Sequence, residues 1–324
     1  MADYILREPI IGGVGIEITE GRYSSLLASN ELIGLIFQIE EFFSLLADAF
    51  VDFETELLHL CLEYFYTDGE QRHNREFFDD ARQKLNLKLV SFLASSRIYE
   101  DQVIKKVGEI NRGKMCSADV NHYFSEAFDS SIEYRVMHAL RNYALHQNIP
   151  MNYLSFHSSN LNQYGHKRAG KPSRLRVTIE PMVSVKDFVA AKKVRQKTRK
   201  EVSSLGVDYL NLKFLIRGFV SLLAGIHENI RQSTQVILDD AFEDLGAAHE
   251  ELRKAKGSYP RFISISGRGP DSELDIDYPE SLRLHKVRRK WSRLKSVQRG
   301  YVSSEIVKDD NAFPLEHASI WIPN

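Results

Sequence analysis

The feature that most constrains the fold is a pair of long stretches with helical periodicity and few helix-breaking residues. From Asn30 to about Tyr66 the apolar residues recur at helical spacing, with no proline and a single glycine, Gly34. Asn30 is a suitable N-cap, and the stretch 67–69 (Thr-Asp-Gly) ends that helix. A second such stretch covers about 74–110. Together they predict a mainly α fold built as a helical bundle.

A third helix is predicted over about 130–147. Ser130 and Glu133 have the spacing of a capping box, and Pro150 lies just past the expected end. On a helical wheel, five apolar side chains share one broad arc and predict the buried face. They are Ile132, Val136, Ala139, Leu140 and Tyr143.

The remaining segments are shorter. Gly12, Gly13 and Gly15 predict a turn between two short strands near the beginning. Residues 151–182 alternate like two strands around a Gly- and Lys-rich connection, which predicts a β-hairpin inserted between helices.

After the hairpin, the helical pattern resumes near Val185 and runs, with a break at Gly206, to about Lys256. Residues 257–280 are rich in Gly, Pro, Ser and Asp and predict a loop or linker. A basic helical stretch then covers about 281–299. We therefore expect a helical domain over 1–256 and a linker with a basic segment over 257–324.

Composition excludes several classes of protein. Hydrophobic residues make up 43% and charged residues 27%, which is typical of a globular chain. The apolar runs are too short to span a bilayer, and the N-terminus has no signal-peptide pattern. Cys61 and Cys116 are too few for a cysteine zinc site and predict reduced thiols. We expect a cytoplasmic protein without membrane contact, metal or cofactor.

The charge is strongly polarised along the chain. Residues 40–80 carry twelve acids and two bases, whereas residues 165–200 carry twelve bases and two acids. Residues 281–300 carry eight bases and no acid. This asymmetry predicts contact with nucleic acid, or an acidic face meeting a basic face within an oligomer.

The polar side of the 130–147 helix is the most informative surface. It carries Arg135, His138, Asn142 and His146, with Arg141 beside them. Asn142 and His146 lie one turn apart. Since Tyr134 and Leu145 also fall among these residues, we expect something to cover this face, such as a second copy of the helix.

These residue types suit the cleavage of RNA by its own 2′-hydroxyl. A histidine exchanges protons near neutral pH, and an arginine fork grips phosphate. Histidine would handle the proton while arginine stabilises charge on the phosphorus. No metal is needed for this chemistry, and the polar stripe contains no carboxylate pair that would hold one.

The segment LRNYALHQN resembles the motif of the HEPN superfamily (higher eukaryotes and prokaryotes nucleotide-binding), which is Arg, four to six residues, then His on a helix. The resemblance implies a HEPN-like helical bundle and a metal-independent endoribonuclease of toxin–antitoxin or anti-phage defence systems. It implies catalytic roles for Arg141 and His146, with Asn142 in support. It also implies a homodimer that joins two motifs, together with a possible antitoxin or regulatory protein.

Other interpretations remain open. The polar residues of this helix could pair with neighbouring acids, and His146 could simply favour the helix dipole. The chain would then be a catalytically silent scaffold that binds RNA or protein. Arg135 and His138 are further candidates for substrate binding.

In the basic stretch 283–299, Arg288 and Arg289 are candidates for contact with RNA phosphates, with Trp291 available for stacking. The same stretch could instead be a solvated helix or an arm that docks on the acidic region 40–80.

Overall fold

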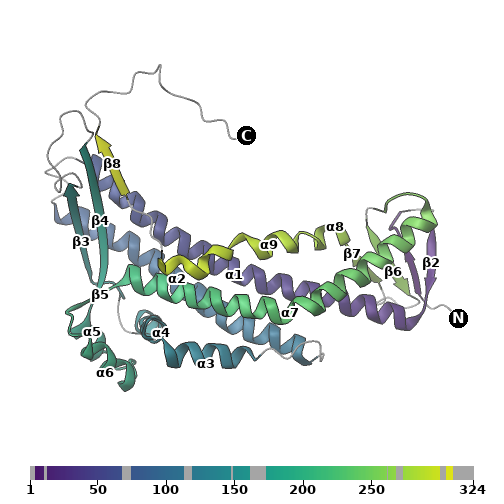
Figure 1. Cartoon of the computed structure of the whole chain (residues 1–324), viewed down its shortest axis with the longest axis horizontal. Helices are drawn as coiled ribbons and strands as arrows, with labels where there is room; N and C mark the ends of the chain where they lie inside the picture. The colour runs from purple at the N-terminus through teal and green to yellow at the C-terminus, as the bar shows by residue number, and fades with distance from the viewer. Residues whose placement is uncertain are drawn as a thin grey trace, which may run out of the picture. The chain divides into compact units, whose positions relative to one another are not determined.

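The computed structural model is mainly α-helical (Figure 1), which confirms the predicted fold class. It describes residues 4–10, 13–67, 74–112, 119–146, 149–160, 173–260, 262–267, 273–299 and 304–308. The chain divides into two compact units, each assembled from three segments. Unit 1 contains residues 1–48, 94–131 and 220–296, and unit 2 contains residues 49–93, 132–219 and 297–324. Three of the boundaries fall inside long helices: α1 (Glu20–Tyr66), α2 (Arg75–Arg112) and α7 (Leu212–Lys256).

A regular apolar stripe explains why α1 is so long. Nine of its buried apolar residues recur alternately at three and four positions, the spacing of helices that pack side by side. They are Leu32, Ile36, Ile39, Phe43, Leu46, Phe50, Phe53, Leu57 and Leu60. The helix begins at Glu20, ten residues before the predicted start, so Asn30 lies inside it rather than capping it. None of the described helices is long and apolar enough to cross a membrane.

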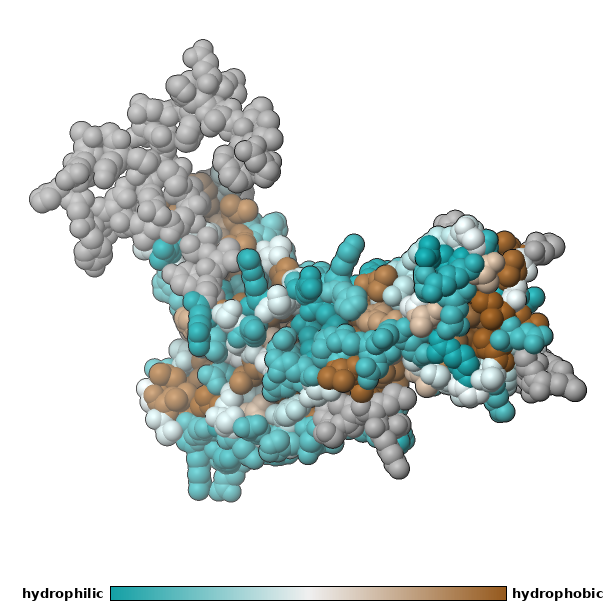
Figure 2. All heavy atoms as spheres, turned by 45° about the vertical axis from the view of Figure 1, so that its right-hand side comes forward, coloured by the Kyte–Doolittle hydropathy of each residue, from teal (hydrophilic) through white to brown (hydrophobic). Residues whose placement is uncertain are grey.

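Unit 1 contains an antiparallel sheet that joins strands far apart in the sequence. β1 (Tyr4–Arg7) pairs with β2 (Gly15–Ile18) on one side and with β6 (Ile263–Gly267) on the other. β7 (Glu273–Ile276) completes the order β2-β1-β6-β7. The prediction of a loop or linker over 257–280 is therefore wrong for these strands. Figure 2 shows hydrophobic residues gathered at this end of the unit, where Ile5, Ile10 and Val14 are exposed.

The other helices of unit 1 are shorter. α3 (Val120–Ser130) is capped by Asp119, whose carboxylate accepts a hydrogen bond from the backbone N–H of His122. α8 (Tyr278–Ser281), α9 (Leu284–Lys290) and a 3₁₀ helix, η2 (Ser292–Arg299), follow the sheet. The last two match the predicted basic helical stretch, although the final residues of η2 belong to unit 2.

Unit 2 contains the predicted hairpin. β3 (Tyr153–Asn160) and β4 (Ser173–Ser184) pair from Tyr153 opposite Met182. β5 (Tyr209–Asn211) and β8 (Ser304–Lys308) both pair with β4, which makes a larger sheet than predicted. The connection 161–172 and Cys116 lie outside the described residues.

Three further helices belong to unit 2: α4 (Ile132–His146), α5 (Val185–Ala190) and α6 (Gln196–Ser204). Gly206, with φ of 64°, adopts the left-handed conformation that favours glycine and separates α6 from β5. This confirms the predicted break. Cys61 is a buried free thiol that contacts the carbonyl of Val177 in β4 at 3.6 Å.

Candidate functional site

The predicted motif lies on α4, which is packed inside unit 2. The helix begins at Ile132, because Ser130 is the last residue of α3 and donates a hydrogen bond to the Glu126 carbonyl at 2.7 Å. The predicted capping role of Ser130 is therefore wrong. Of the predicted core face, Val136, Ala139 and Leu140 are buried, and Ile132 and Tyr143 are half-buried.

The side of α4 predicted to be polar is largely buried as well. Tyr134 is 3% exposed and packs edge-on against Phe219 of α7, with ring centroids 5.1 Å apart. Arg135 is 4% exposed and forms an ion pair with Glu201 of α6, with Nε 2.9 Å from the carboxylate. The chain itself therefore covers this part of α4, where a second copy was expected.

The motif residues occupy the second half of α4. Arg141 is 4% exposed, whereas Asn142 and His138 are half-buried. His146 is the last residue of the helix, one turn after Asn142, and its side chain lies outside the described part of the structure. Arg141, Asn142 and His146 therefore lie on one unbroken helix, as predicted, while Arg135 is paired with Glu201.

A pocket of about 600 Å³ adjoins this part of α4. Its lining comes from α2, α4, α5 and the segment after α4, and consists of Arg82, Tyr143, Ile149, Met151, Asn152, Asp187, Ala190 and Ala191. The buried Asn86 fixes the wall, because its side-chain amide exchanges two hydrogen bonds with the backbone of Met151, at 2.9 and 3.0 Å. Asn152 in turn donates to the Asp187 carboxylate at 2.9 Å. This pocket can accept a ligand of small-molecule size beside Tyr143.

The most strongly perturbed ionisable groups lie in unit 1, around Glu40. This carboxylate, 1% exposed, accepts two hydrogen bonds from Arg231, at 2.9 and 2.6 Å, and lies 3.1 Å from Nε2 of His227. Burial acts to raise the pKa of Glu40, but the hydrogen bonds from Arg231 and His227 together outweigh it and lower the pKa to about 2. Glu40 is therefore ionised at neutral pH although it is buried.

His227 and Tyr99 extend this network. The Tyr99 hydroxyl lies 3.1 Å from Nδ1 of His227, and the His227 ring stacks on Phe43 with centroids 3.9 Å apart. Burial lowers the pKa of His227 and raises that of Tyr99, so both groups are neutral at neutral pH in the folded protein. A consistent assignment has Tyr99 donating to Nδ1 and Nε2–H donating to Glu40. Since Tyr99, His227 and Glu40 are almost completely buried, they position Arg231 rather than meet a substrate.

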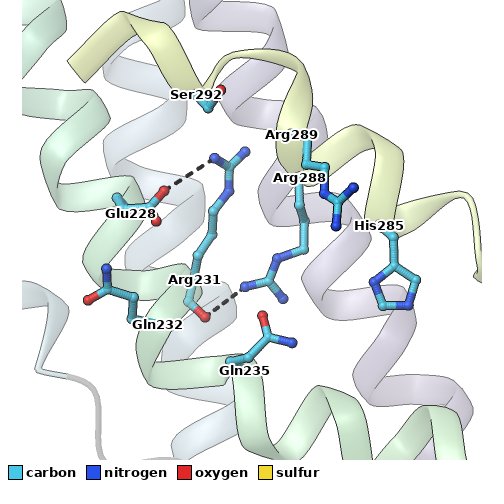
Figure 3. Close-up of a pocket in the computed structure, with 8 residues that line it drawn as sticks. All are labelled: Glu228, Arg231, Gln232, Gln235, His285, Arg288, Arg289 and Ser292. Atoms are coloured by element: carbon cyan, nitrogen blue, oxygen red, sulfur yellow. Dashed lines mark hydrogen bonds and ion pairs between the residues drawn. The ribbon is translucent and has the colours of Figure 1, made fainter. Parts of the chain in front are cut away.

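Next to this network a pocket of about 480 Å³ opens between α7 and the α9–η2 segment (Figure 3). Its lining residues all carry a polar or charged group and are Glu228, Arg231, Gln232, Gln235, His285, Arg288, Arg289 and Ser292. Two of these residues, Arg288 and Arg289, were predicted from the basic stretch. Arg288 is buried, whereas Arg289 is exposed.

Arg288 is held between the two helical segments. Its Nη2 donates to the Arg231 carbonyl at 2.7 Å, and its Nε lies 3.8 Å from Glu40. Figure 3 shows its guanidinium directed from α9 toward α7. Among the buried side-chain atoms that the structure describes, Arg288 Nη1 is one of the few with no hydrogen-bond partner. Burial lowers the pKa of Arg288 and the nearby Glu40 opposes this effect.

Sequence reasoning missed Glu40, Tyr99, His227 and Arg231. A local signal did exist for two of them: His227 and Arg231 are one turn apart on or beside the apolar stripe of α7, between Leu223 and Leu238. Polar residues in such a stripe need a buried partner. The partner itself, Glu40, is far away in the sequence and could not be identified from this pattern.

Comparison with known proteins assigns no family. The chain matches no family model, no curated protein and no solved structure.

Proposed function

We propose that this protein is a metal-independent endoribonuclease of HEPN type whose catalytic residues lie on α4. The observation that carries the proposal is the position of the Arg141-Asn142-x₃-His146 segment: it forms the second half of one continuous helix, and Tyr143 within it lines an open pocket of about 600 Å³. A nucleoside next to the scissile phosphate would occupy this pocket and stack on Tyr143.

In the proposed reaction the RNA supplies its own nucleophile. The 2′-oxygen attacks the adjacent phosphorus while its proton passes to a base, the bond from phosphorus to the 5′-oxygen breaks, and that oxygen takes up a proton. His146 handles a proton, and Arg141 stabilises the charge that develops on the phosphoryl oxygens. The products carry a 2′,3′-cyclic phosphate, or its opened form, and a 5′-hydroxyl.

Burial is compatible with the role given to Arg141. A guanidinium held where water is excluded interacts more strongly with a developing negative charge than one in open solvent. The proposal includes a homodimer through the 130–147 helix, in which the motifs of two copies complete one site. The homodimer is tested by light scattering at micromolar concentration, where a strictly monomeric protein would contradict it.

The direct test is cleavage of tRNA and an mRNA fragment by the full chain in EDTA. We expect RNA products with the ends described above and intact DNA of the same sequence, since DNA lacks the 2′-hydroxyl. His146→Ala should lower the rate by about 10²–10⁴-fold. His59→Ala is the matched control, because His59 is an exposed histidine of the same unit that lies outside the motif.

Arg141→Ala should lose a comparable factor, and Arg141→Lys should recover only part of it, because a point charge does not reproduce the planar fork. Circular dichroism and thermal unfolding separate lost chemistry from lost folding. Products with 5′-phosphates, or full activity in His146→Ala, would place the chemistry on other residues.

A second candidate function is a catalytically silent scaffold that binds RNA or protein. It is favoured by the ion pair between Arg135 and Glu201 and by the near-complete burial of Arg141, both of which are typical of structural arginines. RNA binding in a gel-shift experiment without any cleavage, unchanged by His146→Ala, would support the scaffold over the enzyme.

A further inference from the structure

The pocket between α7 and the α9–η2 segment has an unbalanced charge. Three guanidinium groups line it, from Arg231, Arg288 and Arg289, against the single carboxylate of Glu228 among the described lining residues. Arg231 already donates two hydrogen bonds to Glu40, and its Nη1 also lies 3.6 Å from the Glu228 carboxylate. Nε of Arg288 lies 3.8 Å from the same Glu40 carboxylate, so the groups that remain for an anion are the exposed Arg289 and Nη1 of Arg288.

Arg288 carries the clearest sign of a missing partner. Its side chain is 8% exposed, and its Nη1 has no hydrogen-bond partner among the described residues. A buried donor that is left unpaired costs about 1–3 kcal/mol, so a chain rarely retains one without compensation. An anion in the pocket would accept this hydrogen bond and recover that cost.

We propose that this pocket binds a small phosphate monoester of about mononucleotide size. Phosphate fits the planar arginine fork and takes several hydrogen bonds at once, here from Arg288 and the exposed Arg289. The volume of about 480 Å³ lies within the range of small-molecule sites. Gln232, Gln235 and Ser292 add neutral donors and acceptors for the rest of the ligand.

The buried network behind the pocket gives the site its rigidity. Glu40 fixes the Arg231 side chain through two hydrogen bonds, and the Arg231 carbonyl in turn fixes Nη2 of Arg288. The ligand therefore meets a preformed guanidinium, which lowers the entropy lost on binding. This site shares no residue with the α4 motif, so the proposal does not depend on the proposed ribonuclease activity and can be tested separately from it.

The test is a binding titration of the full chain with inorganic phosphate, AMP, adenosine and acetate at constant ionic strength. Calorimetry measures affinity. The fluorescence of Trp291, directly before the pocket residue Ser292, reports the location of binding in a Trp321→Phe background. We expect saturable binding of AMP, weaker binding of phosphate, and none of adenosine or acetate.

The decisive variants are Arg289→Gln and Arg293→Gln. Both remove one exposed charge from the same segment, but only Arg289 lines the pocket. Arg289→Gln should weaken AMP binding about tenfold or more, in line with a charged hydrogen bond, whereas Arg293→Gln should change it less than about threefold. Arg288→Gln should abolish binding, with thermal unfolding measured alongside because this residue also contacts α7.

Three outcomes would overturn the proposal. They are no saturable binding of AMP or phosphate at millimolar concentration, equal losses in Arg289→Gln and Arg293→Gln, and binding that leaves Trp291 fluorescence unchanged. A 12-residue oligouridylate is the last arm of the titration. If it binds far more tightly than AMP and depends on Arg289, the pocket belongs to an RNA-binding surface and the small-ligand assignment is wrong.

Discussion

The arginines of α4 and those beside α9 show two ways in which a helical protein keeps a guanidinium buried. Arg135 in unit 2 is neutralised by Glu201 of the same unit, and no unpaired nitrogen of it is found among the described atoms. Arg288 in unit 1 shares the carboxylate of Glu40 with Arg231 and keeps one nitrogen without a partner beside an open pocket. A buried basic residue therefore indicates a binding site when neighbouring acids do not fully neutralise its charge, not merely when it is present.

The largest effect should come from removing the shared carboxylate. Glu40→Ala leaves Arg231 and His227 without their buried partner, so we expect the free energy of unfolding to fall by about 3–5 kcal/mol in urea denaturation. Glu41→Ala is the control. The side chain of Glu41, the next residue in α1, is exposed, so this substitution should change the free energy of unfolding by less than about 0.5 kcal/mol. Equal effects of the two substitutions would show that Glu40 does not organise unit 1.

The corresponding change in unit 2 should be smaller. Glu201→Ala deprives Arg135 of its partner, but Glu201 is one-third exposed, so water can replace part of the lost interaction. We expect a loss of about 1.5–3 kcal/mol, the range for hydrogen bonds to charged groups. Asp208→Ala, an exposed acid of the same unit, provides the comparison. A loss as large as that for Glu40→Ala would remove the contrast between the two regions.

Acid should destabilise unit 1 in two steps. The folded-state pKa values of His227 and Glu40 both lie below their ordinary values of 6.5 and 4.5, so the unfolded chain takes up protons first as the pH falls. Above pH 6.5 both residues contribute their full stabilisation to the folded state. The contribution of His227 decreases as the pH falls below 6.5, and that of Glu40 decreases below pH 4.5.

The His227 step is measured by urea denaturation between pH 8 and 5. Below pH 6.5, His227 should contribute up to about 1.4 kcal/mol per pH unit to the slope of the unfolding free energy against pH. His227→Gln should remove this contribution, whereas His59→Ala should leave it unchanged. An identical pH dependence in wild type and His227→Gln would mean that His227 is not held neutral by its burial.

The smallest changes in stability are expected at two glycines of α7, Gly218 and Gly225. A Cβ at Gly218 would lie 2.9 Å from Cγ of Glu133 in α4, whereas a Cβ at Gly225 meets nothing within 4 Å. We expect Gly225→Ala to stabilise by about 0.5–1 kcal/mol through helix propensity, and Gly218→Ala to lose that gain through crowding against α4. Thermal unfolding of the two variants checks this, and an equal gain at both positions would show that α4 is loosely packed there.

Local patterns predicted the elements that depend on nearby residues. The long helices, the hairpin and the break at Gly206 follow from periodicity and turn chemistry within short windows. β6 was missed because the segment ISISG is short and its neighbourhood is rich in glycine and serine. It pairs with β7 on one side and, on the other, with β1, which is far away in the sequence.

The candidate sites were predictable to different degrees. Arg288 and Arg289 were indicated by a run of bases, but nothing local distinguished the buried Arg288 from the exposed Arg289. The burial of Arg135 was not predicted either, because it depends on Glu201 and on the packing of α6 against α4. Such pairings between distant segments are set by tertiary structure, and a single sequence does not contain a pattern that reveals them.

The sheet of unit 1 also affects how the chain folds during synthesis and how truncated fragments behave. Tyr4 of β1 pairs with Gly267 of β6, so one edge of β1 stays open until residue 267 has left the ribosome. An open edge with an exposed isoleucine, Ile5, is a site for pairing with other chains. Fragments that end before β6 should therefore aggregate during expression, and chaperone capture of the nascent chain should persist until β6 emerges.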